Sequence, residues 1–236
     1  MGIYLDGIRD GRVREAVTAH TGARYTQHSA GVADGVEGFV AFFEPFVARN
    51  PSRHIEIVRA LEDGRYVFLQ AYQSLNDGEA EWVTTDLFDT DEDGKIIEHW
   101  DVISAFEGPG PSGHTQVDGR TEITDLGETE ANKARIRLFM TEVLQNGDFS
   151  RFDQYVAEDL IQHAVGLEDG RDAMRERIEE ARDVGARCDY VFKVVGQGDF
   201  VTTYSKSVRE DEAVAVFNIW RLENGQIVEH WSNAET

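Results

Sequence analysis

The sequence predicts an α+β protein made of two tandem copies of one small domain, and three observations lead to this prediction. The stretch from Gly94 to Trp100 (GKIIEHW) returns almost unchanged from Gly225 to Trp231 (GQIVEHW). Each half also carries helix-like segments followed by strand-like segments in the same order. Finally, 236 residues leave room for two domains of about 110 residues, each large enough to bury a core.

Two helices are predicted in the first half. Apolar residues at helical spacing from Arg12 onward predict a helix that ends near Gly22, followed by a short extended piece from Tyr25 to His28. The next helix is predicted over 36–47, where four phenylalanines recur at i, i+3, i+4 and i+7: Phe39, Phe42, Phe43 and Phe46.

Four strands are predicted to follow, because β-branched and aromatic residues are enriched over 54–61, 66–75, 81–89 and 95–104. The residues between these runs are typical of hairpin turns: Asp63-Gly64, Asn76-Asp77-Gly78 and Asp91-Glu92-Asp93-Gly94. Three hairpins in series predict an antiparallel meander behind a helical layer, which is an α+β arrangement.

The second half repeats this order after a linker. Residues 107–128 contain a Gly-Pro-rich stretch and show no periodicity, so the predicted domains are 1–106 and 129–236. Gln162-His163 followed by Asp169-Gly170 matches Gln27-His28 followed by Asp34-Gly35 at the same spacing. Four of the seven histidines therefore fall at two matched positions, which favours a duplication.

Composition excludes several classes of partner. Forty-five acidic residues against twenty-three basic ones give a net charge of −22, which repels nucleic acids and anionic membrane surfaces. No apolar run approaches the roughly 18–20 residues of a membrane helix, and the first residues show no signal-peptide pattern. The single cysteine excludes an internal disulfide framework. We therefore expect a soluble, cytoplasmic protein.

A candidate pocket follows from side-chain alternation along the strands. His99 and Asp101 share one face of their strand, Trp82 and Asp86 share a face of the preceding one, and Gln70 and Tyr72 share a face of the strand before that. A polar set with aromatic walls on a curved sheet is typical of a small-molecule site. The predicted set is His28, Gln70, Tyr72, Trp82, Asp86, His99 and Asp101.

A carboxylate beside an imidazole in a partly apolar cavity is suited to general acid–base catalysis at a carbon next to a carbonyl. Two alternatives stay open. The histidines could serve folding only, by completing hydrogen-bond networks. A metal could also bind to His28 and His99 with Asp101 or Asp86, a two-histidine, one-carboxylate set. Phosphate-binding glycine loops, Gly-x-Ser-x-Gly and Cys-x-x-Cys motifs are missing from the sequence.

The two copies are not chemically equal. Asp101 aligns with Ser232, and Asp86 aligns with Asn218, so the second copy lacks both carboxylates. It still offers a predicted ligand-binding set: Tyr204 (aligned with Gln70), Asn218, His163 and His230. The second copy is therefore expected either to bind a ligand or to act as a built-in partner subunit.

The repeated pattern of Gln-His, Asp-Gly, a helix and then Glu-His-Trp resembles the SnoaL-like polyketide cyclases of the nuclear transport factor 2-like superfamily. The resemblance covers residues 3–104 and 129–234. It implies two cone-shaped domains, each a strongly bent antiparallel sheet packed on about three helices with the pocket inside. It also implies that the copies pair as a pseudo-dimer within one chain, with a homodimer as a further option.

The resemblance further implies an intramolecular aldol condensation that needs neither a metal nor an organic cofactor. By position, Asp101 matches the acid/base residue, while His99, Gln70 and Tyr72 match residues that orient the substrate. With His28 as a second polarising group, our hypothesis is a cyclase, lyase or isomerase acting on a small hydrophobic carbonyl compound. The alternative is a non-catalytic protein that binds hydrophobic small molecules, because one fold hosts many functions.

Overall fold

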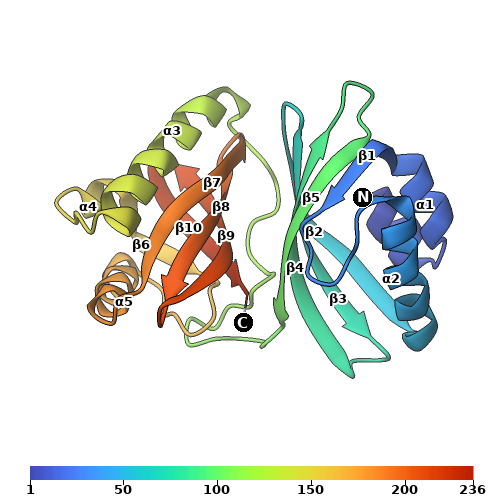
Figure 1. Cartoon of the computed structure of the whole chain (residues 1–236). Coiled ribbons are helices and arrows are strands. Elements are labelled where there is room, and N and C mark those ends of the chain that lie inside the picture. The colour runs from blue at the N-terminus through green and yellow to red at the C-terminus, as the bar shows by residue number, and fades with distance from the viewer. Residues whose placement is uncertain (236) are drawn as a thin grey trace. The chain divides into compact units, whose positions relative to one another are not determined.

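A computed structural model describes residues 1–235 of the chain. The chain divides into two compact units, Met1–Phe106 and Glu107–Thr236. Within the described residues, each unit contains one five-stranded sheet with helices, which is the predicted α+β class (Figure 1). Among residues 1–235, no helix is long and apolar enough to cross a membrane.

The first unit begins with helices and continues into a sheet whose strand order is β1-β5-β4-β3-β2. Its elements are the π-helical segment η1 (Ile3–Arg9), α1 (Val13–His20), β1 (Thr21–Gln27), α2 (Gly35–Arg49), β2 (Arg53–Asp63), β3 (Tyr66–Leu75), β4 (Ala80–Thr90) and β5 (Ile96–Ala105). The four predicted strands are therefore present as an antiparallel meander, β2 to β5.

Strand β1 differs from the sequence-based expectation in length and in direction. Helix α1 ends at His20. The hydroxyl of the next residue, Thr21, donates to the Val17 carbonyl of the last helical turn at 2.7 Å. β1 then pairs with β5 in parallel, with Gln27 opposite His99. The sheet is mixed because β1 reaches β5 by a long crossover through α2 and three strands, which parallel pairing requires.

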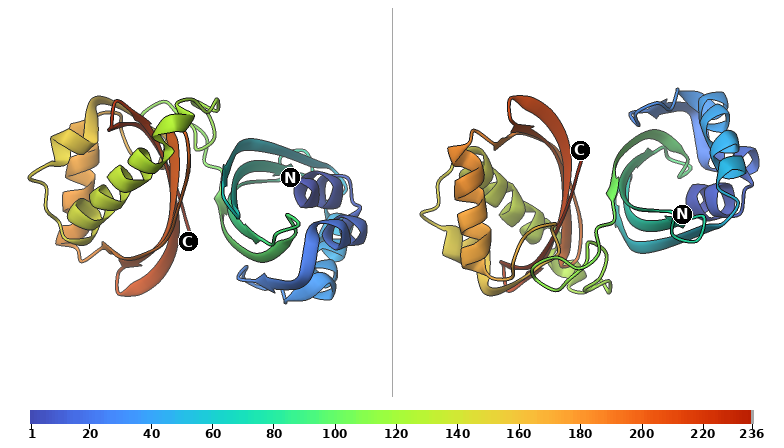
Figure 2. Two further views of the ribbon diagram at one scale, coloured as in Figure 1. Left: turned by 90° about the horizontal axis from the view of Figure 1, so that it is seen from above. Right: turned by 90° about the horizontal axis from the view of Figure 1, so that it is seen from below.

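The two faces of the first-unit sheet have different surroundings. Leu69, Ala71 and Phe88 belong to the same apolar cluster as residues of the helices, among them Val17 and Phe39. We call this helix-packed side the inner face and the opposite side the outer face. Figure 2 shows this sheet curving around its helices, so inner-face side chains of neighbouring strands converge.

The second unit repeats the topology, with strand order β6-β10-β9-β8-β7. Its elements are η2 (Leu126–Glu128), α3 (Thr129–Phe139), the π-helical η3 (Met140–Gln145), α4 (Phe152–Tyr155), β6 (Val156–Gln162), α5 (Arg171–Asp183), β7 (Arg187–Gln197), β8 (Phe200–Arg209), β9 (Glu212–Glu223) and β10 (Gln226–Ala234). β6 pairs with β10 in parallel, as β1 pairs with β5.

The inner face of the second sheet is filled by large apolar side chains. Trp220 and Val201 from the strands pack in one cluster with Ile136, Phe139 and Met140 from the helices. All five are at most 1% exposed. Because close packing to this degree leaves little room between helices and sheet, the second unit has a dense core where the first carries polar groups.

Segment 107–128, predicted as a linker, is held against the second unit by several hydrogen bonds. The Trp231 indole N–H donates to the Asp118 carbonyl at 3.0 Å. Two hydrogen bonds join Thr124 to Asp199. The Thr124 N–H donates to the Asp199 carboxylate at 2.7 Å, and the Asp199 N–H donates to the Thr124 carbonyl at 2.9 Å. The segment therefore forms an ordered strap on this unit.

Candidate functional site

The inner face of the first unit carries two carboxylates directly opposite each other. Asp86 on β4 pairs in register with Asp101 on β5. Asp86 is completely buried, whereas Asp101 is only partly buried. Like charges in directly opposed positions repel, and a buried carboxylate is costly unless it is hydrogen bonded, so Asp86 needs partners.

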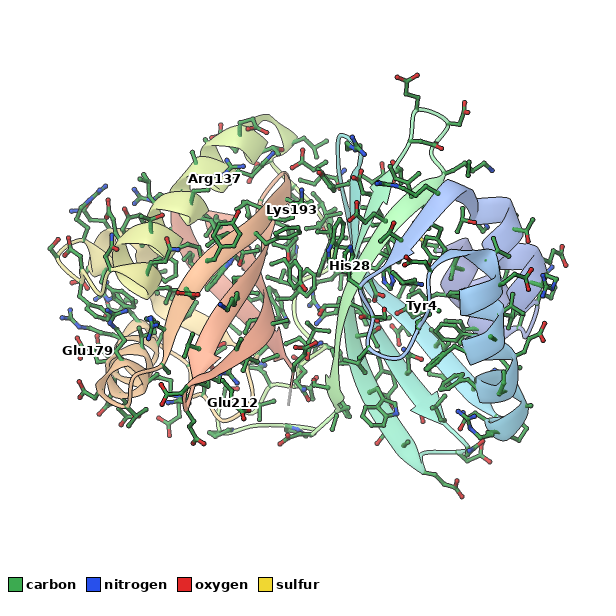
Figure 3. All side chains as sticks on the ribbon, in the orientation of Figure 1. Tyr4, His28, Arg137, Glu179, Lys193 and Glu212 are labelled. Atoms are coloured by element: carbon green, nitrogen blue, oxygen red, sulfur yellow. The ribbon has the colours of Figure 1, made fainter. Side chains whose placement is uncertain are left out.

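Tyr4 and His99 supply those partners. The Tyr4 hydroxyl lies 2.8 Å from both oxygens of the Asp86 carboxylate and donates to it. On the neighbouring strand, His99 Nε2 lies 2.8 Å from Asp86 Oδ1. Tyr4 comes from η1, some eighty positions away in the chain, and Figure 3 labels it among the side chains of the helical layer.

The hydrogen-bond chain continues to Gln27 and Tyr25. The Gln27 amide NH₂ donates to the Tyr25 hydroxyl at 2.6 Å. This contact turns the Gln27 amide oxygen toward His99 Nδ1, which it approaches at 2.7 Å. An amide oxygen only accepts, so Nδ1 donates to it, and Nε2 lies against Asp86. The result is a continuous chain of hydrogen bonds across the inner face, from Tyr25 to Tyr4.

Both tyrosines of this network keep their protons. Burial, followed by the negative charge of Asp86, raises the pKa of Tyr4 well above its usual value. Burial also raises the pKa of Tyr25, with smaller contributions from the charges of Asp86 and Asp101. Each phenol thus remains a hydrogen-bond donor over the physiological pH range.

Asp86, His99 and Asp101 also offer donor atoms that lie within 4.8 Å of one another, an arrangement that could hold a metal ion. It differs from the set considered from the sequence, because His28 is not among its members. In this set, Asp86 already accepts a hydrogen bond from the Tyr4 hydroxyl.

Three of the predicted site residues lie on the outer face, away from Asp101. His28 stacks on Trp100, with ring centroids 5.0 Å apart, and its Nε2 lies 2.9 Å from Glu98; Figure 3 labels its position at the end of β1. The expectation that His28 joins His99 in one pocket was therefore wrong. Adjacent residues on a strand point to opposite faces, and the inward-facing partner of His99 is Gln27.

Gln70 and Tyr72 are on the outer face for the same reason. Gln70 pairs with Thr85 rather than with Asp86, and its amide oxygen accepts from Arg59 at 2.6 Å. Tyr72 donates to Glu81. The sequence pattern grouped residues within each strand correctly, but the register between β3 and β4 places this pair on the other side from Asp101.

Trp82 does share the inner face with Asp101, as predicted. It lies on β4 at alternate positions to Thr84 and Asp86, and it is 37% exposed. On β5, Ile103 follows Asp101 on the same face and is 48% exposed. Trp82 and Ile103 are thus two accessible apolar side chains on the inner face. Along the strands, they lie beyond Asp101 in the direction away from His99.

A cavity of about 140 Å³ lies at the other end of this face. Tyr4 and Phe88 line it, together with His20, Val67 and Ile96. None of Asp86, His99 and Asp101 lies on its wall, although Phe88 stacks on the His99 ring at 4.6 Å. Of the network residues, Tyr4 therefore lines the cavity, whereas the exposed side chains of Trp82 and Ile103 share the inner face with Asp101.

In the second unit, the matching inner-face residues form a neutral network. His230 Nδ1 lies 2.9 Å from the Gln162 amide oxygen, and Nε2 lies 3.0 Å from that of Asn218. Trp220 stacks on the His230 ring at 4.1 Å. Burial, and to a lesser extent the nearby His163, lowers the pKa of His230 to about 3. His230 is therefore an uncharged, packed residue.

The other two residues predicted for the second site lie on the outer face. Tyr204 stacks on Phe217 at 4.4 Å. His163 stacks on Trp231 at 4.5 Å, and its Nε2 lies 2.9 Å from Glu229. Tyr204 and His163 thus do not join His230 and Asn218 in one pocket.

Part of the repeated motif serves folding in both units. The Asp34 carboxylate accepts from the Gln27 N–H at 2.7 Å, and the Asp169 carboxylate accepts from the Gln162 N–H at 2.7 Å. These bonds close the loop that follows β1 and β6. Gln27 recurs as Gln162 in the second unit, and each glutamine contacts the histidine of the Glu-His-Trp motif, so the repeat could have identified Gln27 as a site residue. No sequence pattern links Tyr4 to Asp86.

The comparisons with known proteins agree with this duplicated architecture. A family model described as the SnoaL-like domain matches residues 4–99 and 136–230. No protein with a curated description matches the chain.

Three solved structures of similar fold illustrate the comparison, and each corresponds to less than half of the chain. A provisionally assigned ketosteroid isomerase from Kribbella flavida is 15% identical, with 46% of this chain and 81% of that one covered and a TM-score of 0.43. IdmH, a provisionally assigned polyketide cyclase from Streptomyces antibioticus, is 18% identical, with 44% and 91% covered and a TM-score of 0.38. An NTF2-like protein of unknown function from Mesorhizobium loti is 24% identical, with 46% and 94% covered and a TM-score of 0.41.

Proposed function

We propose that this chain, which belongs to the family of SnoaL-like domains, is an enzyme that moves protons on a small carbonyl compound in its first unit. The observation that carries the proposal is the partly accessible Asp101 opposite the buried Asp86, which Tyr4 and His99 hold by hydrogen bonds. An accessible carboxylate beside a buried, hydrogen-bonded proton path is suited to general acid–base catalysis.

In the proposed reaction, Asp101 removes a proton from the carbon next to a carbonyl. The C–H bond breaks, its electron pair forms the enolate, and the proton resides on Asp101. The enolate carbon then attacks a second carbonyl of the same molecule and the resulting alkoxide takes the proton from Asp101, or Asp101 returns the proton to another carbon of an extended enolate. The first outcome is an aldol cyclisation and the second is an isomerisation, and neither changes the oxidation level of the substrate.

The remaining members of the network have supporting roles. Asp86 is buried and lies opposite Asp101, and both conditions disfavour its charge. The contacts with Tyr4 and His99 offset this cost. Gln27 fixes the orientation of the His99 ring through Nδ1. His99 thus has a defined proton to hold or return, which is how a positioned imidazole assists proton transfer.

The ligand class follows from the neighbours of Asp101. Trp82 and Ile103 share its face and remain accessible, so they offer an apolar surface for the body of the ligand while its reacting carbon lies at Asp101. Sites of this anatomy, with apolar walls and few polar groups, bind small hydrophobic molecules. The second unit lacks both carboxylates and has a packed inner face, so we assign that face a structural role.

The test follows solvent deuterium incorporation into a panel of enolisable ketones and diketones by NMR. Wild type is expected to exchange the α-hydrogen of at least one class, and Asp101→Asn is expected to lower that rate by about 100-fold or more. Ser232→Asn, which introduces the same residue at the matching position of the second unit, is the control and should leave the rate unchanged. Equal rates in wild type and Asp101→Asn would overturn the assignment.

A non-catalytic binding protein is the second candidate, because the accessible Trp82 and Ile103 suit ligand binding without any reaction. Thermal shift separates the two. A ligand that stabilises wild type and Asp101→Asn equally, with no deuterium incorporation in either, supports the binding role.

A further inference from the structure

The second unit carries another cluster of potential ligand atoms, separate from the inner face. Donor atoms of His114, Asp118 and His163 lie within 4.8 Å of one another. His114 and Asp118 come from the strap 107–128, whereas His163 directly follows β6. We propose that these three side chains bind a divalent transition-metal ion such as Zn²⁺, with an open coordination position toward an adjacent cavity.

The surroundings of His163 favour a cation. Its side chain is 0% exposed, and three acceptors surround its ring. Glu229 Oε1 lies 2.9 Å from Nε2, while Asp118 Oδ1 and the Thr115 carbonyl lie 2.6 Å and 3.0 Å from Nδ1. A neutral imidazole has one N–H to donate. With Nε2 directed at Glu229, a metal ion at Nδ1 would contact the other ring nitrogen beside the Asp118 carboxylate and the Thr115 carbonyl.

Glu229 provides the outer partner that metal-binding histidines usually have. A histidine that ligates a metal through one nitrogen typically donates its other N–H to a carboxylate, which fixes the ring. The Nε2 contact with Glu229 has this geometry, and Arg221 Nε donates to the second Glu229 oxygen at 2.7 Å. The Trp231 indole also stacks on the His163 ring, with centroids 4.5 Å apart. His163 is thus oriented with Nδ1 toward Asp118.

The strap is shaped to bring its two ligands to His163. Gly119 has a φ of +86°, and a Cβ there would lie only 2.3 Å from Glu229 Oε1 and 2.7 Å from His163 Nε2. Glycine therefore lets the strap backbone pass close to Glu229 and His163. The Thr115 N–H donates to Asp118 Oδ2 at 3.1 Å, and the Ser112 hydroxyl donates to the Gln162 carbonyl at 2.7 Å. Asp118 and His114 are therefore held on a fixed loop.

Two imidazoles and one carboxylate form a donor set that suits zinc and similar ions. With metal–ligand distances of about 2.0–2.1 Å, tetrahedral coordination places donor atoms about 3.3 Å apart. The donor atoms span up to 4.8 Å, so His114 must move closer, while Asp118 Oδ1 and His163 Nδ1, which lie 2.6 Å apart, must separate to admit the ion. His114 can make this movement because its side chain is 37% exposed.

A cavity of about 200 Å³ adjoins the cluster. His114 and His163 line it together with Pro109, Gln116 and Val165. Catalytic zinc sites keep three protein ligands and leave a position for water or substrate. The proposed ion would have this arrangement, with its fourth position open to water or a small anion in the cavity. The inference does not rest on the proposed function of the first unit.

The test measures Zn²⁺ by isothermal titration and Co²⁺ by visible absorption, using the full chain after dialysis against chelator. Wild type is expected to bind one equivalent and to give the strong visible bands of four-coordinate Co²⁺. Azide should shift these bands by occupying the open position. His114→Gln, at a half-exposed loop residue, should weaken binding by at least about tenfold, and so should Asp118→Asn.

Two controls locate the ion. His54→Gln removes an exposed histidine of the first unit and should leave binding unchanged, as should Asp101→Asn. Binding that survives both His114→Gln and Asp118→Asn would overturn the proposal. So would binding that is lost in Asp101→Asn, which would place the ion in the first unit, or wild type with no tight site above the weak background of a chain of net charge −22.

Discussion

Asp86 and Asp101 face each other across β4 and β5, one completely buried and the other partly accessible. The corresponding pair in the second unit is Asn218 and Ser232, which pair in the same register. The duplicated fold therefore holds a charged pair in one copy and a neutral pair in the other. This difference changes the electrostatics of the inner face without changing the backbone that carries it.

Removing the Tyr4 hydroxyl should show how much Asp86 depends on its donors. Tyr4→Phe is expected to lower the free energy of unfolding by about 1–3 kcal/mol, because a buried carboxylate loses a hydrogen bond. Denaturant titration measures the change. Tyr190→Phe, at a residue 59% exposed, is the matched control and should stay within about 0.5 kcal/mol of wild type. A Tyr4→Phe variant as stable as wild type would contradict the role of Tyr4.

Substitutions at the matched glutamines, Gln27 and Gln162, should distinguish an effect on stability from an effect on the proposed reaction. Gln27→Leu and Gln162→Leu each remove an amide that contacts a buried histidine, so each should cost about 1–2 kcal/mol of stability. Only Gln27→Leu should also slow deuterium exchange, by about tenfold or more, and alter its pH profile, since His99 lies in the proton path. Equal exchange rates for the two variants would contradict the assignment of the path to the first unit.

His230 predicts a specific pH dependence of stability. Its pKa is about 3 in the folded chain and about 6.5 when unfolded, so the unfolded state binds more protons below pH 6.5. Stability should therefore fall as pH decreases, by about 2 kcal/mol between pH 8 and pH 5 from this residue alone. Urea unfolding of wild type and His230→Gln at several pH values measures the difference in slope. Parallel pH curves would show that His230 is not held neutral.

The sequence was sufficient to predict the duplication, the α+β class and four of the five strands of the first sheet. Those features follow from local patterns: β-branched runs, hairpin turns such as Asn76-Asp77 with positive φ, and a motif written twice. The parallel strand β1 was predicted only as a short extended piece, because its partner β5 lies some seventy positions away and no local pattern encodes that pairing.

For the candidate site, alternation along a strand correctly grouped Trp82 with Asp86 and His99 with Asp101. It placed Gln70, Tyr72 and His28 with them incorrectly, because a group within one strand does not specify which neighbouring residues share its face. That choice depends on the register between strands, which a shift of one residue reverses. Segment 107–128 was predicted as a linker, and its hydrogen bonds to the second unit could not be predicted from local patterns.

By itself, then, the sequence determined what is local in this protein: the repeated motif, the strand periods and the loss of both carboxylates in the second copy. Only the tertiary structure decided which side chains meet, since Tyr4 reaches Asp86 across eighty positions and His114 reaches His163 through the strap. The physical reason is that hydrogen-bond partners are selected by strand register and by packing of helices on the sheet, and these act between residues far apart in the chain.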